Sequence, residues 1–415
     1  MPHSDALKGW LLAISLLAHC STVTGDDFRG SGAHRAPPTL KQAVESAYNR
    51  HPRVQTLDAQ QEEAMALQSR ADSLIAGNPS LEVSYKTDQI GSANGFRDWE
   101  AGIAAPLWKP GQRDAAQNVA LSASQALTHS QRALRLVIAG EVRERMWQAA
   151  LMQNNLQLAN KEWDTAQTLK HSVKRRVELG GLAKTDLLLA RDATLTKRAD
   201  HAKAQLEFEN ARLSYASFTG LQRLPRRRGE QRTALTTINE DYPQLAEVAG
   251  ELKRAKAELS AVRRQGAGNP ELFLGGSGER ADSNEAFNNR LGVSLSMPFG
   301  LEAHNRPVLA AAKRKIVQLK AEYENLLRKI KLAFVQAKQE LEFAQAELEL
   351  AREQKQLSLE NLRLAKIAFE AGETDLVGLL RVQGLAFSAE RRETQLHIIR
   401  QRSVARYNQA LGVLP

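Results

Sequence analysis

Apolar and polar residues alternate one by one in two short parts of this chain, at about residues 79–107 and 270–299. Strict alternation over several residues predicts β-strands with one apolar and one polar face. Each part holds two such strands around a polar loop, and each therefore predicts a β-hairpin. The alternating apolar positions include Leu81, Val83, Tyr85, Leu291, Val293 and Leu295.

Much longer segments repeat apolar residues at steps of three and four, which predicts amphipathic helices. The repeating positions of the later segment are Ile316, Leu319, Tyr323, Leu326, Ile330, Ala333 and Ala337, followed by Leu341, Ala344, Leu348 and Ala351. They form a heptad seam with one four-residue stutter, predicted after Ala337. A matching segment from about Arg113 to Leu179 is interrupted only by Gly140. At 1.5 Å per residue, each segment predicts a rod roughly 100 Å long.

Glycines close both of these long segments. Gly180 and Gly181 end the first, Gly372 ends the second, and a further helical segment follows each. We therefore predict two antiparallel helical hairpins with glycine turns at their tips, at about residues 112–220 and 306–412.

An earlier helix is predicted near the start of the ordered pattern. Thr39 is its expected N-cap, because Gln42 follows at the spacing of a capping box. The helix is expected to kink at His51-Pro52 and to end at about Ile75.

The chain repeats this order of elements after about 190 residues, which indicates a duplicated domain rather than a short solenoid module. Ala-Gly-Asn-Pro at Ala76–Pro79, for example, returns at Ala267–Pro270. We predict a first repeat at residues 39–221, a linker at 222–236 and a second repeat at 237–415. Each repeat has the order helix-strand-strand-helix-helix, so the fold is mainly α with a small β part.

Composition and charge narrow the function. The chain is 42% hydrophobic but only 5% aromatic, which suits long helices better than a large globular core. Its net charge is +10, yet basic and acidic residues are interleaved. We therefore expect a solvated helical surface and no binding of nucleic acid.

Residues 1–25 have the pattern of a secretory signal, with a short apolar run at Trp10–Ala18, and residues 26–38 predict a polar tail. Cys20 is a candidate for lipidation, although His19 stands where a lipoprotein signal has a small residue. No later segment has about 20 apolar residues in a row, so no transmembrane helix is expected in the mature chain.

The strands have the length of tilted membrane strands, although a soluble four-stranded sheet on a helical core is the alternative. Four strands cannot cross a membrane alone, because an open sheet leaves two edges of unpaired backbone groups in lipid. Several chains would have to pool their strands into one barrel, with the helical hairpins continuing it as a tube.

The doubled order, Asn78-Pro79 before the first strand, Pro106–Trp108 after the second and the glycine-turned hairpins together resemble the outer-membrane efflux factor (TolC-like) family. Lys109–Arg113 and His304–Arg306 are similar to segments of its cobalt-zinc-cadmium subgroup. The resemblance implies a homotrimer in outer-membrane lipid, with a twelve-stranded barrel continued by a twelve-helix coiled-coil tunnel in the periplasm. It also implies two partners, a periplasmic adaptor (membrane fusion protein) and an inner-membrane pump.

In that family, aspartates six and nine residues beyond the tip glycines narrow the closed end of the tunnel. Asp186 matches in the first repeat, whereas Gly378 and Arg381 stand at the two positions of the second. Our hypothesis is that the aperture is formed by Asp186, Arg381, Glu370, Glu373 and Asp375, which would form charged rings in a symmetric oligomer.

Aromatic residues flank the predicted strands, and such residues gather at membrane interfaces. The candidates are Trp99, Trp108, Phe96 and Phe287; Trp108 has the opposite parity to Trp99, so packing is the alternative for it.

The nine histidines show no metal-ligand spacing, and no catalytic motif is present, so we expect neither enzyme activity, metal nor cofactor. The sequence thus predicts a passive exit duct of an efflux system, for metal ions, drugs or proteins. The alternative is a periplasmic coiled-coil adaptor or scaffold.

Overall fold

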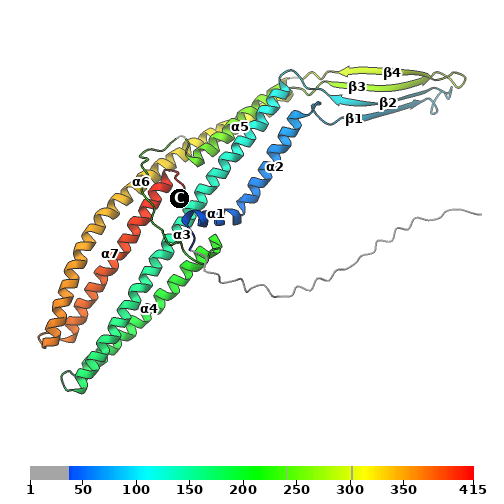
Figure 1. Cartoon of the computed structure of the whole chain (residues 1–415). Coiled ribbons are helices and arrows are strands. Elements are labelled where there is room, and N and C mark those ends of the chain that lie inside the picture. Colours follow the sequence, from blue (N-terminus) through cyan, green and yellow to red (C-terminus); the bar gives the residue numbers. More distant parts are fainter. Residues whose placement is uncertain (1–36, 240, 301) are drawn as a thin grey trace, which may run out of the picture. The chain divides into compact units, whose positions relative to one another are not determined.

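The computed structural model describes residues 37–239, 241–300 and 302–415. The expected signal segment and Cys20 lie outside these residues. Two units are distinguished, Met1–Pro37 and Pro38–Pro415, and the description below concerns the second. Its elements are α1 (Leu40–Arg50), α2 (Arg53–Asp72), β1 (Ser80–Thr87), β2 (Arg97–Pro106), α3 (Gln112–Glu178), α4 (Lys184–Thr219), α5 (Pro243–Gln265), β3 (Glu271–Arg280), β4 (Asn288–Ser296), α6 (Glu302–Ala371) and α7 (Leu376–Ala410) (Figure 1).

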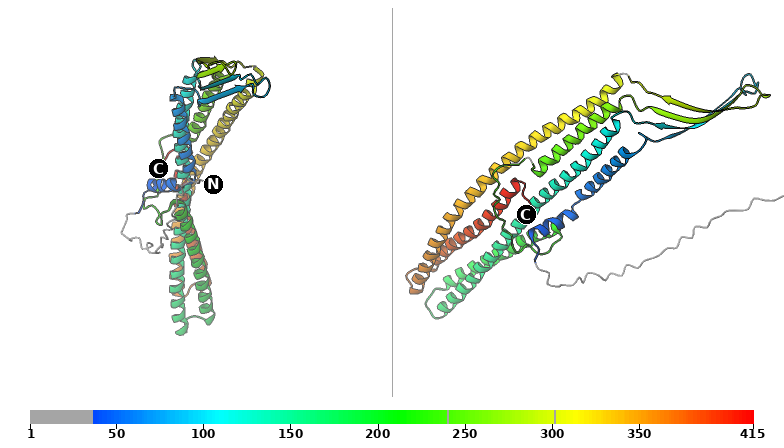
Figure 2. Two further views of the ribbon diagram at one scale, coloured as in Figure 1. Left: turned by 90° about the vertical axis from the view of Figure 1, so that its right-hand side faces the viewer. Right: turned by 45° about the horizontal axis from the view of Figure 1, so that its top comes forward.

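The helices form two rows of four that share their two longest members. Near the sheet, α2 contacts α3, α3 contacts α5 and α5 contacts α6 (Figure 2). Toward the hairpin tips, α4 contacts α3, α3 contacts α7 and α7 contacts α6. Helices α3 and α6 run through both rows with 67 and 70 residues, about 100 Å each.

The predicted first helix is in fact two helices. The Thr39 capping box is confirmed: the Thr39 N–H donates to Gln42 Oε1 at 2.8 Å, and the Gln42 N–H donates to Thr39 Oγ1 at 3.2 Å. The prediction of one kinked helix reaching Ile75 is wrong. His51 is extended, because a residue before proline avoids the α conformation, and α2 ends at Asp72.

The seam of α6 is confirmed, but its stutter lies earlier than predicted. Ala333 is exposed, and Phe334 is half-buried in its place. The two consecutive four-residue steps therefore run from Leu326 through Ile330 to Phe334. Ile330 packs with Leu245 of α5, whereas Phe334 packs with α7, so the stutter falls where α6 changes partner.

Gly140 lies inside α3, which continues through it as one helix, so the rod predicted from about Arg113 to Leu179 is confirmed. The missing side chain of Gly140 has a packing role. A Cβ at Gly140 would lie 2.9 Å from Gln409 Nε2, and that amide donates to the carbonyl of Leu136 at 2.8 Å. Gly140 thus admits the end of α7 to the surface of α3.

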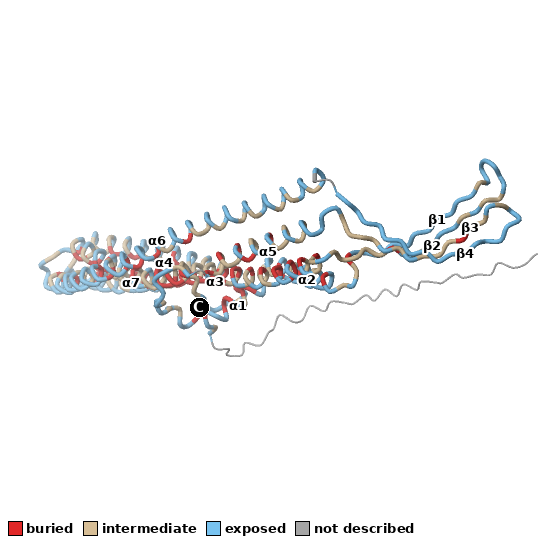
Figure 3. Tube along the Cα trace, turned by 90° about the horizontal axis from the view of Figure 1, so that it is seen from above, coloured by how far each residue is buried: buried red, intermediate tan, exposed pale blue. Residues whose placement is uncertain are grey.

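The strands form one antiparallel sheet in the order β1-β2-β3-β4. Its register pairs Leu81 with Ile103, Ile103 with Leu274 and Leu274 with Val293, so one face is apolar from edge to edge. The large apolar side chains of this face are exposed in the single chain, Leu291 at 93%. The two outer strands, β1 and β4, are exposed along their length (Figure 3). The predicted alternation is confirmed.

The glycines of β3 make room for aromatic rings. A Cβ at Gly278 would collide with the indole of Trp99, and a Cβ at Gly275 would collide with the ring of Phe273. Trp99 reaches Gly278 from the neighbouring strand β2, and such cross-strand rings compensate for glycine in a sheet. Phe273 lies on β3 itself. This packing accounts for Gly275 and Gly278.

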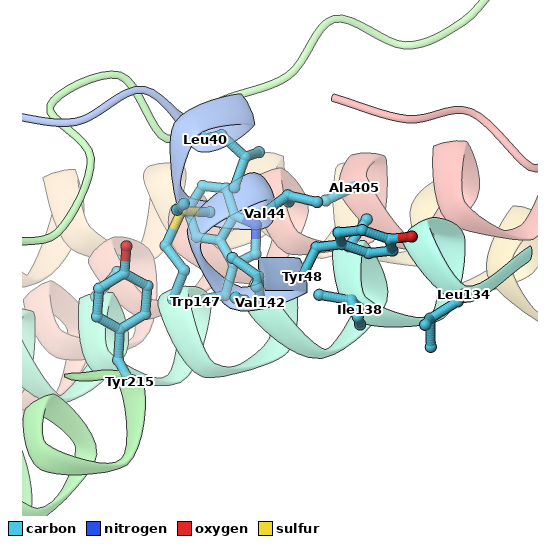
Figure 4. Close-up of a cluster of buried hydrophobic side chains, with 14 of the residues drawn as sticks. Leu40, Val44, Tyr48, Leu134, Ile138, Val142, Trp147, Tyr215 and Ala405 are labelled. Atoms are coloured by element: carbon cyan, nitrogen blue, oxygen red, sulfur yellow. The ribbon is translucent and has the colours of Figure 1, made fainter. Parts of the chain in front are cut away.

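The main core lies where α1 and α7 meet α3 and α4 (Figure 4). The cluster includes Leu40, Val44, Tyr48, Leu134, Ile138, Val142, Trp147, Tyr215 and Ala405. Beside it, the guanidinium of Arg143 is only 2% exposed. We call this part of the chain, with residues 221–239 and the end of α7, the equatorial region.

Candidate aperture at the hairpin tips

The two hairpin tips make the same backbone turn. Gly180 and Gly372 have φ angles of 73° and 80°, in the left-handed region that favours glycine. The Gly181 N–H donates to Arg176 O, and the Glu373 N–H donates to Ala368 O, both at 2.8 Å. Each tip is therefore a Schellman motif, as the sequence pattern predicts.

Gly181 is not conformationally required. Its counterpart in the second tip is Glu373, and its φ is not among the positive ones. A Cβ at Gly181 would make only an ordinary contact of 3.5 Å with Arg176 O.

Two of the candidate acids cap helices. Asp375 is the N-cap of α7 and accepts from the Gly378 N–H at 2.8 Å. Asp186 lies in the first turn of α4 and accepts from the Ala183 N–H at 3.1 Å. Each helix therefore has one half of a capping box, and the two repeats use opposite halves.

The other three aperture candidates, Arg381, Glu370 and Glu373, are exposed, whereas Asp186 is half-buried. Among the residues that the structure describes, none of the five candidates forms a salt bridge, and no two of them are joined by a hydrogen bond. One chain alone therefore places them at the same end of the hairpins without assembling a site.

An apolar cluster joins the two tips. Val173 of α3 packs with Phe369 of α6 and Leu379 of α7. Arg176 reinforces the contact, because its guanidinium carbon lies 5.0 Å from the centre of the Phe369 ring and its Nη1 donates to Phe369 O at 3.3 Å. Beside the cluster, an open groove of about 690 Å³ runs between α3, α6 and α7.

Above the tips, the contact between the hairpins is polar. The carboxylate of Glu162, 3% exposed, accepts from Lys197 of α4 at 2.8 Å and from Arg391 of α7 at 2.5 Å. Lys161 pairs with Glu390 at 2.6 Å. Sequence reasoning missed this ladder, although the charged pair Lys161-Glu162, which closely follows the apolar Leu158 and Ala159, was a signal for it.

The equatorial region holds a second buried ion pair that sequence reasoning missed. Arg143 donates to both carboxylate oxygens of Glu230, at 2.9 and 2.6 Å, and to Val413 O at 3.1 Å. Asn408 donates to Gln231 O at 2.9 Å. An arginine among the apolar neighbours Val142 and Met146 was its only sequence signal.

The aromatic candidates fall at two ends of the sheet. Phe96, Trp99 and Phe287 lie at the end with the polar loops, and the guanidinium of Arg280 stands 5.2 Å from the Phe287 ring centre. Trp108 lies at the helical end, where its Nε1 donates to Ser73 O at 3.0 Å. Trp108 therefore has a packing role in the single chain.

Every helix in the described residues is too short or too polar to span a lipid bilayer. In the same residues no group of three His, Cys, Asp or Glu side chains is placed to hold a metal ion.

Solved structures supply the comparison. CusC, described in terms of folding and transmembrane channel formation, has a TM-score of 0.73 at 18% identity, over 90% of this chain and 92% of its own. The outer-membrane channel OprN has a TM-score of 0.71 at 19% identity, over 90% of each chain. The Campylobacter jejuni outer membrane channel CmeC has a TM-score of 0.68 at 15% identity, over 99% of this chain and 94% of its own.

The chain has the TolC-like outer-membrane channel fold. At these identities the likeness establishes the fold. No protein-family model and no curated protein matches the chain. Several different channels fit about equally well, so the comparison does not select the cobalt-zinc-cadmium subgroup. In this chain the sheet and the hairpin tips lie at opposite ends of the helices (Figure 1).

Proposed function

We propose that this protein is the outer-membrane channel of a tripartite efflux system, a passive duct for export. The observation that carries the proposal is the sheet. Its apolar face is exposed from β1 to β4, and both outer strands have an unpaired edge. Exposed apolar surface of this extent marks an interface, and lipid is the partner that suits a face with aromatic residues near its ends.

The outer helices support assembly into a closed ring. Helices α4 and α6 flank the row at the tips, and each exposes a stripe of large apolar residues at heptad-related spacing. The stripes consist of Leu188, Leu195, Leu206 and Leu213 on α4, and Phe343, Leu350, Leu357 and Leu364 on α6. Packing α6 of one copy on α4 of the next would bury both stripes, as in a coiled coil.

A homotrimer is the assembly that we propose. Three copies would place twelve strands in the barrel and twelve helices in each row, and every sheet edge would then be paired. The polar face of the sheet, with Glu82, Glu100 and Arg290, would line water.

The aperture is proposed at the tips, with Asp186, Arg381, Glu370, Glu373 and Asp375 as its charged residues. Arg381 is the most informative of these, because it is exposed, caps no helix and is the one basic residue of the five. Replacing a ring of three positive charges should alter the ion selectivity of the pore.

The partners are proposed to be a periplasmic adaptor and an inner-membrane pump that supplies the energy. The groove beside the tip cluster supports adaptor docking, because it combines apolar Phe369 and Leu379 with polar Gln383 and Glu370. The same groove would suit a helical hairpin, which binds through apolar anchors in a polar surround.

Reconstitution in planar bilayers tests the proposal. The mature protein should form discrete channels, should resist carbonate extraction and should run as a heat-sensitive oligomer. Arg381→Gln should change ion selectivity, whereas Arg392→Gln, higher on the same helix, should not. A folded protein that gives no conductance and is released by carbonate would instead support a periplasmic scaffold.

A further inference from the structure

An open pocket of about 580 Å³ lies in the equatorial region, between the end of α1, the middle of α3 and the end of α4. Its polar and aromatic lining consists of Arg50, His51, Arg145, Ser214, Ser217 and Phe218. The polar side chains are thus two guanidiniums, one imidazole and two hydroxyls. No carboxylate lines the pocket, although acidic residues are common elsewhere on these helices.

Both arginines are held in place by neighbouring residues of α3 and α4. The guanidinium carbon of Arg145 lies 4.0 Å from the centre of the Phe218 ring, and its Nη1 donates to Glu141 Oε2 at 2.9 Å. Arg50 packs against Gly220, where φ is 74° and an added Cβ would lie 3.1 Å from the guanidinium. Arg50 has no salt bridge among the residues that the structure describes.

The imidazole of His51 is also oriented. Its Nδ1 accepts from the backbone N–H of Arg53 at 3.2 Å, so Nε2 carries the proton in the neutral ring. His51 therefore contributes an N–H donor, and Ser214 and Ser217 add hydroxyl donors.

The duplicated architecture does not require this pocket. It depends on α1 and on the break at His51-Pro52. The described residues ahead of Tyr242, 221–239 and 241, form no helix corresponding to α1. The pocket therefore does not follow from the helical-hairpin fold that the two repeats share.

We propose that this pocket binds an oxyanion, a phosphate or carboxylate group, through Arg50 and Arg145, with His51 and the two serines as further donors. Planar guanidinium groups match the oxygens of both anions, and hydrogen bonds between charged groups are stronger than neutral ones. The site lies away from both the tips and the sheet, so it is independent of the channel proposal.

Isothermal titration calorimetry of the mature protein in detergent tests the site. Sodium phosphate and sodium acetate are titrated separately into chloride buffer of matched ionic strength. Wild-type protein should bind at least one of the two anions. Arg50→Gln should weaken that binding on the order of tenfold, as expected for the loss of one charged hydrogen-bonding partner. The preferred anion identifies whether the natural group is a phosphate or a carboxylate.

Arg226→Gln is the matched control, because Arg226 is exposed in the linker, does not line the pocket and carries the same charge. It should bind like the wild type. If Arg50→Gln does not fold, Ser217→Ala removes one exposed hydroxyl and should weaken binding by a smaller factor. Absence of binding by both anions, or equal binding by the pocket variants and Arg226→Gln, would overturn the proposal whatever the channel recordings show.

Discussion

The two repeats are alike at the hairpin tips and different in the equatorial region. At the tips, the repeats make one backbone turn with different side chains: glycine at the same position, and a cap supplied by Asp186 in one and by Asp375 in the other. In the equatorial region, the repeats are not interchangeable. Arg143 of the first binds the end of the second, and α1 has no counterpart among the described residues of the second.

The difference shows where a duplicated sequence is free to vary. A turn needs one conformation, and several residue combinations supply it. A buried ion pair needs two specific partners, because either one left alone is an uncompensated charge in a poorly solvated place. We therefore expect substitutions in the equatorial region to cost much more than those at the tips.

The largest effect is expected from Glu230→Gln. The substitution leaves Arg143 buried without its carboxylate and should lower the free energy of unfolding by about 3–5 kcal/mol. Denaturant unfolding followed by circular dichroism would measure it. Glu349→Gln removes an exposed carboxylate that pairs with Arg352 and should cost less than about 1 kcal/mol. Similar losses of unfolding free energy for the two variants would contradict the expected difference between a buried ion pair and an exposed one.

Alanine at the tip glycines should have an intermediate effect. Gly180→Ala and Gly372→Ala each force a side chain into the left-handed region, at about 1–2 kcal/mol. Because nothing lies within 4 Å of an added Cβ at either position, the two losses should be equal. Gly181→Ala should be close to neutral. A loss of stability there as large as at Gly180 would contradict the assignment of the left-handed conformation to Gly180 and not to Gly181.

The caps allow the likeness of the tips to be tested directly. Asp375→Ala should cost about 1 kcal/mol, the usual worth of an N-cap. Ala183→Asp adds the missing N-cap residue to α4, which already has Asp186 in its first turn. It should raise the free energy of unfolding by up to about 1 kcal/mol. A destabilising Ala183→Asp would mean that the two tips differ more than their backbones show.

The smallest effects concern the dependence of stability on pH. The contributions of two glutamates should change in opposite directions as the pH rises. Burial alone would raise the pKa of Glu144, but hydrogen bonds from Arg406 and Arg402 outweigh it and hold that pKa below the usual 4.5. Burial raises the pKa of Glu247, and the nearby carboxylates of Glu251 and Glu322 add to the shift.

The signs follow from linkage. Ionised Glu144 stabilises the fold above pH 4.5, and this contribution is lost as the pH falls through its lowered pKa. Neutral Glu247 stabilises the fold below pH 4.5, and this contribution is lost as the pH rises through its raised pKa. At pH 7, Glu144→Gln should therefore destabilise and Glu247→Gln should stabilise, each by less than about 1 kcal/mol. Unfolding curves at pH 4 and pH 7 would show whether the two variants diverge in these directions.

Local patterns carried most of the fold. The alternation at Leu291–Leu295 needed no knowledge of the partner strand, and the Thr39 cap needed only Gln42. Features that depend on two distant segments were missed, such as the ion pair between Glu230 and Arg143. The stutter was misplaced by about two turns, because Ala333 and Phe334 are both apolar and only the arrival of α7 decides which faces inward. For the tips, the turns followed from sequence, whereas the aperture depends on copies that one chain does not contain.

The continuity of α3 has a mechanical consequence. The helix has no break between the tip and the sheet, and its one mid-length glycine is clamped by Gln409. A torque applied at the tip would therefore be transmitted along about 100 Å of stiff rod to β2. In α6, by contrast, Pro307 removes a backbone hydrogen bond near the sheet and makes a compliant joint there. The long helix of the first repeat should thus transmit a rotation from the tip to the sheet, whereas that of the second should bend near Pro307.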